Sequence, residues 1–216
     1  MRPLSILIAD DHAVVRRGLR ALLETQPEWR VCGEADNGRE AVQKAQQLQP
    51  DLVILDISMP ELNGLDATIQ ILEAVPQARI LILTMHSNEE LIEATVKDGA
   101  KGYLLKSDAE RDLIAAVNAL RQQKTFFTQA ATDIFLDSFR GERRAGTRAN
   151  GTRLTPRERE IVQLLAEGRS NKGVAAALGI SPRTVENHRA KIMDKLHLHS
   201  FGDLVRYAIR NRIVEP

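Results

Sequence analysis

The sequence predicts an α/β domain built on a doubly wound parallel sheet, followed by a smaller all-α domain. In the first part, apolar runs of four to six residues alternate five times with helical patterns, which is typical of a (βα)5 sheet covered by helices on both faces. In the last part, four helical patterns follow one another without a strand pattern. A length of 216 residues is compatible with two such domains.

The charged residues are divided unevenly along the chain, although the net charge is only +1. Residues 1–123 carry 13 Lys and Arg against 19 Asp and Glu, whereas residues 153–216 carry 12 against 7. An acidic first part and a basic last part indicate two separate tasks, and the basic part is suited to binding a polyanion.

Composition disfavours secreted and membrane-spanning classes of protein. No apolar run approaches the ~20 residues that span a bilayer, and the start, MRPLSILIADD, turns acidic too soon for a signal peptide. Cys32 is the only cysteine, which excludes an internal disulfide. We therefore expect a cytoplasmic protein with no membrane partner.

Short apolar runs predict the five strands of the first domain, at residues 5–9, 31–35, 51–56, 79–84 and 102–105. Helical patterns follow them, at residues 14–23, 41–48, 65–75, 90–98 and 113–120. Asn37, Asn63, Ser87 and Ser107 stand where helix caps are expected, and three of them are followed at the third position by Glu, as in a capping box.

The third strand carries the central feature of the first domain. Its run Leu52–Leu55 is continuously apolar, as expected for a strand buried on both faces, and Asp56 follows directly. Ligands bind at the carboxyl ends of such strands, where the strand order reverses. The polar residues at these ends are Asp10, Asp11, Asp56, Thr84 and Lys106.

This set of side chains predicts a phosphoryl-accepting site with a metal ion. Three neighbouring carboxylates repel one another, and a hard cation such as Mg²⁺ relieves that repulsion. Lys106 offers a point charge and Thr84 a hydroxyl to a phosphoryl group, and a carboxylate can serve as the nucleophile.

The ordered set resembles the receiver domain of bacterial two-component response regulators, over residues 4–123. The resemblance implies that a sensor histidine kinase phosphorylates Asp56. It implies that Mg²⁺ is held by Asp11, Asp56 and the backbone carbonyl of Ser58, with Asp10 acting largely through water. It further implies that Thr84 and Tyr103 reorient on phosphorylation, and that Ser58 and His86 tune the loss of the phosphoryl group.

Two of these residues have plainer alternative interpretations, and one neighbour departs from the family pattern. Tyr103 can equally be a half-buried strand aromatic, and His86 an exposed loop histidine. Many receiver domains have a proline, often with a cis bond, after the lysine, whereas Ser107 follows Lys106 here.

Residues 124–152 are interpreted as a linker between a first domain of residues 1–123 and a second of residues 153–216. The segment 141–151, GERRAGTRANG, is polar and glycine-bearing, which is typical of a mobile connection. Its apolar residues predict a short helix that packs on another element; they are Phe126, Phe127, Ile134, Phe135 and Leu136.

The second domain is predicted to contain a helix-turn-helix. Thr155, Pro156 and Glu158 form a capping box with proline at the first helical position, and Ser170 starts a second helix that Gly179 ends. Ser181 and Pro182 start the third helix, and Ser200 the fourth. Two short helices joined by a glycine turn in a basic module indicate DNA binding.

The stretches LTPRERE, GRSNKGVAAALGIS and TVENHRAKIMDKL resemble the LuxR-type helix-turn-helix, over residues 153–213, and the whole chain is similar to the NarL/FixJ subfamily. The third helix is expected in the major groove, with Asn187 reading adenine and Glu186 cytosine. The expected DNA-binding residues are Ser170, Asn171, Lys172, Arg183, Thr184, Glu186, Asn187, His188 and Lys191. Gly173 replaces the family's usual Glu, so Ser170 lacks its capping-box partner.

The preferred interpretation is a transcription regulator, switched by phosphorylation of Asp56, that dimerises on promoter DNA and contacts RNA polymerase. One alternative is a regulator whose receiver domain acts by protein binding without phosphorylation. Another is a phosphatase of the haloacid dehalogenase type, which is disfavoured because that family places its nucleophile after the first strand as Asp-x-Asp.

Overall fold

The computed structural model describes residues 2–85, 89–128 and 154–214. By its internal contacts the chain divides into two compact units, residues 1–147 and residues 148–216, and each is described by itself. Within these described ranges, no helix combines the length and apolar character needed to cross a bilayer. His86, Ile134, Phe135, Leu136 and the segment 141–151 lie outside the described residues.

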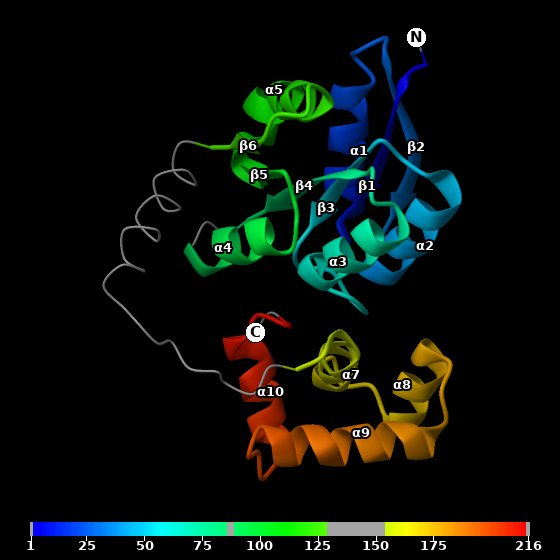
Figure 1. Ribbon diagram of the computed structural model, residues 1–216, viewed down its shortest axis with the longest axis vertical. Coiled ribbons are helices and arrows are strands. Elements are labelled where there is room, and N and C mark those ends of the chain that lie inside the picture. The colour runs from blue at the N-terminus through cyan, green and yellow to red at the C-terminus, as the bar shows by residue number, and fades with distance from the viewer. Residues whose placement is uncertain (1, 86–88, 129–153, 215–216) are drawn as a thin grey trace. The chain divides into compact units, whose positions relative to one another are not determined.

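The first unit is built on a six-stranded parallel sheet with the order β2-β1-β3-β4-β5-β6 (Figure 1). The strand order reverses between β1 and β3, so the switch point of the sheet lies there. The bounds of the strands are β1 Leu4–Ala9, β2 Trp29–Ala35, β3 Leu52–Asp56, β4 Arg79–Thr84, β5 Gly102–Leu105 and β6 Phe126–Phe127.

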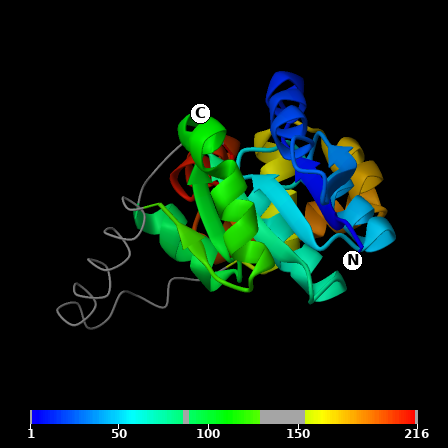
Figure 2. The ribbon, with the colours of Figure 1, turned by 90° about the horizontal axis from the view of Figure 1, so that it is seen from above.

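Helices cover both faces of this sheet (Figures 1 and 2). Alternate residues of β1 belong to different cores: Ile6 and Ile8 pack with helices α1 and α5, and Leu7 and Ala9 pack with helices α2, α3 and α4. The bounds of these helices are α1 Ala13–Leu23, α2 Gly38–Leu48, α3 Gly64–Ala74, α4 Glu89–Lys97 and α5 Ala109–Arg121. The predicted doubly wound α/β class is confirmed.

The edge of the sheet differs from the prediction, because Phe126 and Phe127 form strand β6 rather than part of a helix. The register pairs Gly102 with Phe126 and Tyr103 with Phe127. Phe126 packs on the core beneath α1 and α5, whereas Phe127 packs on the opposite core. Two adjacent aromatic residues therefore cover both faces of the sheet edge, which a helix could not do.

The predicted capping box at Ser107 is also wrong. A 3-10 turn, η1, spans Lys106–Asp108, and α5 begins at Ala109 without a side-chain cap bond at Asp108. Lys106 therefore follows β5 directly and opens a tighter turn that precedes α5.

Between residues 154 and 214, the second unit forms four helices, α7 Pro156–Ala166, α8 Asn171–Leu178, α9 Pro182–Lys195 and α10 Phe201–Arg210. Their N-terminal caps follow the predictions: the side chains of Thr155, Ser170, Ser181 and Ser200 each accept a bond from the backbone N–H three residues on. Gly179 ends α8 with φ +64°, a conformation that favours glycine.

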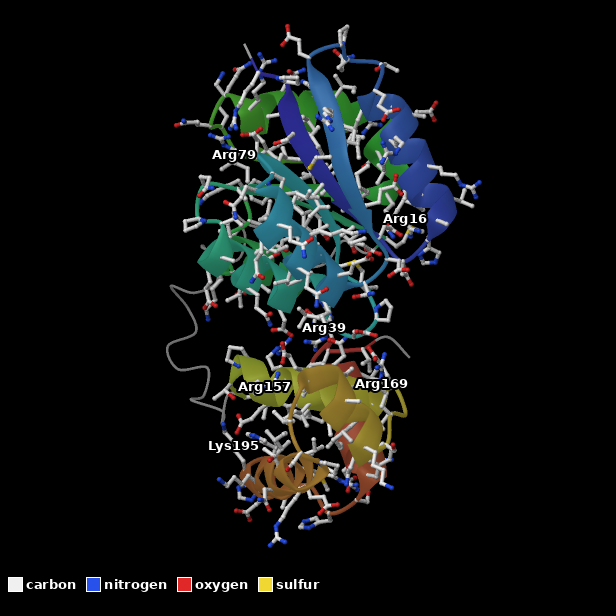
Figure 3. The ribbon with its side chains drawn as sticks, turned by 90° about the vertical axis from the view of Figure 1, so that its right-hand side faces the viewer. Arg16, Arg39, Arg79, Arg157, Arg169 and Lys195 are labelled. Carbon is white, nitrogen blue, oxygen red and sulfur yellow. The ribbon has the colours of Figure 1, made fainter. Side chains whose placement is uncertain are left out.

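Side-chain bonds between helices fix the positions of α7, α8 and α9. Arg157 of α7 donates to the carbonyl of Leu178 at 2.9 Å, and Lys195 of α9 pairs with Glu158 at 2.7 Å (Figure 3). The buried Val185 and Ile192 place the inner face of α9 on the shared core. The helix is therefore held from one side, and its other side is left to solvent.

Candidate functional site

Lys106 joins the ends of three strands at the switch point. Its Nζ lies 2.8 Å from Asp10 Oδ2 and 2.7 Å from Asp56 Oδ2. Asp10 follows β1, Asp56 ends β3 and Lys106 follows β5, so parallel strands deliver all three groups to one edge. The side chains of Asp10, Asp56 and Lys106 are only 1%, 3% and 9% exposed.

Burial sets the electrostatics of this edge. Burial raises the pKa of Asp56 to about 6; the charge of Asp10 adds to this, while Lys106 and the backbone of Ser58 oppose it. Burial alone would lower the pKa of Lys106, but its bonds to Asp10 and Asp56 outweigh burial and raise it. The ion pair thus favours the charged form of both Lys106 and Asp56, but burial still leaves Asp56 with an unusually high pKa for a carboxylate.

Asp11 and His12 complete the rim of the edge. Ligand atoms of Asp10, Asp11, His12 and Asp56 all lie within 4.8 Å of one another. Asp11 is about one-third exposed, so it faces solvent beside the buried pair. Three carboxylates and one ammonium carry a formal charge of −2, and this donor set fits a hard divalent cation.

The loop after β3 folds tightly against Asp56. The N–H of Gly64 donates to the carbonyl of Ile57 at 2.8 Å, and a Cβ on Gly64 would lie 2.0 Å from the carbonyl oxygen of Asp56. Only glycine allows this approach. The backbone of Ser58 hydrogen-bonds to the Asp56 carboxylate, which keeps the loop at the site.

Thr84 is the last residue of β4 and is 1% exposed. Tyr103 lies within β5 and is 0% exposed. Tyr103 is a strand aromatic, as one interpretation expected, but its side chain is fully buried rather than half-buried. In the parallel register of β4 and β5, Ile82 pairs with Tyr103 and Thr84 with Leu105.

Arg16 supports the loop that carries the acidic pair. Its Nη1 donates to the carbonyl of Asp10 at 2.6 Å, and its Nε lies 3.4 Å from Glu34 of β2 (Figure 3). Arg20 also pairs with Glu34 at 2.6 Å. Helix α1 is thus tied to the end of β1 through charged side chains.

The outer face of α9 is the second candidate site. Arg183, Glu186, Asn187 and Lys191 are exposed there. Thr184 and His188 are half-buried, and the Thr184 hydroxyl lies 2.8 Å from that of Ser181 at the helix cap. The face thus presents donors and acceptors in the pattern that the sequence predicts.

The start of α8 offers a further group of polar residues. Ser170 and Lys172 are exposed and Asn171 is half-buried. The Ser170 hydroxyl accepts the N–H of Gly173 at 3.2 Å, so the cap forms although its reciprocal partner is missing.

Four of the predicted residues of the first unit come together as a cluster, and two further residues join them. Asp10, Asp56 and Lys106 are in direct contact, and Asp11 lies beside them. Sequence reasoning missed His12 and Arg16. Their one sequence signal is proximity to the acidic pair, because His12 follows Asp11 directly and Arg16 lies one helical turn further on.

Two family descriptions match the chain. Residues 6–118 match the family described as "Response regulator receiver domain", and residues 152–208 match "Bacterial regulatory proteins, luxR family". The first match contains the whole acidic edge, and the second contains helices α7, α8 and α9.

Similar proteins extend over nearly the full length. The chain is 41% identical to the oxygen regulatory protein NreC of Staphylococcus carnosus, over 98% of this chain and 100% of that protein. A structure of the RcsB response regulator of Salmonella typhimurium has a TM-score of 0.60 at 28% identity, over 96% and 98% of the two chains. A structure of two RcsB dimers bound to two parallel DNAs has a TM-score of 0.59 at 27% identity, over 95% and 98%. With its receiver and luxR-family matches together, this chain belongs to the two-component response regulators that regulate transcription through a LuxR-type helix-turn-helix.

Proposed function

We propose that Asp56 accepts a phosphoryl group from a sensor histidine kinase. The observation that carries this proposal is the contact of Lys106 Nζ with both Asp10 and Asp56 at the switch point of the sheet. Phosphorylation places up to two negative charges beside Asp56, where a buried cation is already in position to contact a phosphoryl oxygen.

The transfer needs little from the protein beyond positioning. The N–P bond of the kinase phosphohistidine breaks as a bond forms between phosphorus and an Asp56 Oδ atom. The histidine nitrogen keeps the electron pair of the broken bond and takes up a proton. Asp56 acts in its ionised form, and Lys106 and the Thr84 hydroxyl orient the phosphoryl oxygens.

The donor set fits Mg²⁺, which when bound would neutralise charge on the phosphoryl oxygens. Asp11, Asp56 and the Ser58 carbonyl would hold the ion, with Asp10 contributing largely through water. The tight loop that Gly64 permits supports this role of Ser58, because it keeps that backbone segment beside Asp56. Ser58 and His86 would tune the lifetime of the phosphoryl group, and Thr84 and Tyr103 would pass its presence to neighbouring elements.

Labelling with a small phosphodonor tests the acceptor. The full chain with Mg²⁺ and acetyl phosphate should gain one phosphoryl group by mass, and Asp56→Asn should gain none. Asp36→Asn changes an exposed aspartate outside the site and should label as the wild type does. Labelling of Asp56→Asn at the wild-type level would contradict the assignment.

We further propose that residues 153–216 form a DNA-binding domain, and that the receiver domain includes β6, so the linker within the predicted segment 124–152 begins after Phe127. Asn187 and Glu186 would read base edges, and the remaining expected contacts would hold phosphates and orient α9. The exposed outer face of α9 supports this, as does the DNA-bound state of the similar RcsB.

Phosphorylation of Asp56 would raise the dimer fraction, and a dimer would bind inverted half-sites about one helical turn apart. RNA polymerase would then be a partner of the DNA-bound dimer. Sedimentation with and without beryllofluoride, alongside binding to DNA with one or two half-sites, tests this mechanism. Unchanged dimerisation together with unchanged affinity for the two-site DNA would rule it out.

A further inference from the structure

His12 lies at the mouth of the acidic edge, immediately before α1. Its main-chain N–H donates to Asp10 Oδ1 at 2.8 Å, which fixes the backbone against the site. Its ring Nδ1 lies 2.6 Å from Asp11 Oδ1 and 3.4 Å from Asp10 Oδ1. The ring therefore faces the carboxylates that are candidates to hold a cation.

Helix capping does not explain a histidine at this position. His12 is the N-cap residue of α1, yet its side chain makes no cap bond. At the corresponding positions of α2 and α3, Asn37 and Asn63 both cap their helices through side-chain oxygens. Ser, Thr, Asp or Asn would serve α1 better, so helix capping does not account for the imidazole.

The ligand atoms around it suit a coordination sphere of mixed donors. One ligand atom each from Asp10, Asp11, His12 and Asp56 falls within a span of 4.8 Å. The His12 side chain is 66% exposed, so the ring has room to turn its nitrogen toward an ion. We infer that His12 supplies an imidazole nitrogen to a divalent cation at this edge and biases the site toward first-row transition ions such as Mn²⁺ over Mg²⁺.

The selectivity follows from the chemistry of the donors. Mg²⁺ prefers carboxylate, carbonyl and water oxygens, whereas imidazole nitrogen favours transition ions increasingly along the Irving–Williams series. Carboxylates bind both kinds of ion, so an added nitrogen ligand changes the ratio of the Mn²⁺ and Mg²⁺ affinities. This inference rests on the proposed metal site, but it concerns one added ligand and can fail while that site stands.

Electron paramagnetic resonance of the full chain with Mn²⁺ as the only added metal provides the test. The wild type should show the nitrogen couplings of directly bound imidazole, and His12→Asn should lack them. Asn is a good N-cap residue, so this variant should keep α1 intact. Mn²⁺ affinity should fall about tenfold in His12→Asn, the low end for disturbed metal sites, with Mg²⁺ affinity, measured by competition, changed less than about twofold.

His197→Ala removes an exposed histidine of the second unit and should keep both the couplings and the affinity. Bound Mn²⁺ without nitrogen couplings would mean that His12 only pairs with Asp11, which overturns this inference and leaves the proposed phosphoryl site intact. Equal loss of Mn²⁺ and Mg²⁺ affinity in His12→Asn would overturn it as well. Absence of any binding of either ion would contradict the metal site itself.

Discussion

The acidic edge of the first unit and the outer face of α9 both present charged side chains, but they hold them in opposite ways. Asp10 and Asp56 are at most 3% exposed and share one buried ammonium. Arg183, Glu186 and Lys191 stand in solvent on a helix whose other side is anchored by core residues. One site thus places charge where water cannot stabilise it, whereas the other leaves its charges solvated.

Because of this difference, stability and function should be coupled at the acidic edge and largely independent of each other on the outer face of α9. A buried charge that loses its partner destabilises the fold strongly, whereas a solvated charge contributes little. Substitutions at the acidic edge should therefore change folding and chemistry together. Substitutions on the α9 face should change DNA binding and leave folding nearly unchanged.

The largest effect is expected when Lys106 is removed. Lys106→Met leaves Asp10 and Asp56 buried without a cation, which should lower the free energy of unfolding by about 3–5 kcal/mol at pH 7.5. Urea unfolding followed by fluorescence measures this unit alone, because Trp29 is the only tryptophan and is buried in β2.

Lys101→Met is the matched control, because Lys101 is exposed just before the same strand. It should change the free energy of unfolding by less than about 0.5 kcal/mol. A loss for Lys106→Met no larger than that of the control would show that the buried carboxylates do not depend on this ammonium.

The second effect concerns the charge of Asp56. Its pKa of about 6 in the folded protein exceeds the ordinary aspartate value of 3.8. The folded state therefore binds more protons than the unfolded state between about pH 4 and pH 6, and stability falls as the pH rises through this window. Without metal, Asp56→Asn should be more stable than the wild type by roughly 2–3 kcal/mol at pH 8.

The advantage of Asp56→Asn should shrink as the pH falls through 6 toward 4, because the wild-type carboxyl becomes neutral too. Trp29-monitored urea unfolding across this range, with a chelator present, gives the comparison. If the difference in the free energy of unfolding between the two proteins did not change with pH, Asp56 could not be a buried charge. Its carboxylate would then be solvated, as the charged groups on the α9 face are.

How far the sequence predicted the first site depends on how each residue is placed. Asp10, Asp56 and Lys106 were predicted because apolar runs mark strands, and parallel strands bring their ends together. His12 was missed because its place in the cluster depends on the orientation of its ring toward Asp11. The spacing of apolar residues in the sequence carries no information on that orientation. β6 was mistaken for helix because two residues carry no pattern, and only the pairing with Gly102 and Tyr103 defines the strand.

The second unit was predicted more completely, because its signals are local. Caps at Thr155, Ser170, Ser181 and Ser200 and the turn at Gly179 depend on residues no more than a few positions apart. The Ser107 box in the first unit is a local signal too, but the chain there forms a 3-10 turn that begins at Lys106, whose side chain contacts Asp56. Local signals therefore predicted the helix caps of the second unit but not the start of α5.

The third effect is on DNA binding rather than folding. Asn187→Ala should relax the preference at one base pair by about 1–3 kcal/mol, while its thermal unfolding stays within about 0.5 kcal/mol of the wild type. Competition binding against DNA with single base changes measures the preference. Lys172→Ala is the companion variant, and it should weaken specific and random DNA alike and reduce the salt dependence. Equal losses on specific and random DNA for Asn187→Ala would remove its base-reading role.

The smallest effect concerns the N-terminus of α8, where the two capping patterns of the second unit can be compared directly. In α7, Glu158 accepts the N–H of Thr155 and completes the capping box, whereas Gly173 cannot do so for Ser170. A Cβ on Gly173 would lie 3.6 Å from its nearest neighbours, which is ordinary contact, so a side chain fits. Gly173→Ala should stabilise the unit by about 0.5–1 kcal/mol, because glycine loses more backbone freedom on folding.

Gly173→Glu should add a few tenths of a kcal/mol or more to the gain from alanine by restoring the reciprocal bond. Gly179→Ala makes the same chemical change at the other end of α8, but there φ is +64°, so it should destabilise by roughly 1–2 kcal/mol. Far-UV circular dichroism of the full chain, with Trp29 fluorescence marking the transition of the first unit, separates the two unfolding events. Hydrogen exchange of the α8 amides should slow in Gly173→Ala and quicken in Gly179→Ala. Stability changes of opposite sign for the two Gly→Ala substitutions would show that backbone conformation limits the stability of α8. The charged residues of the neighbouring helix α9 would not explain such a difference.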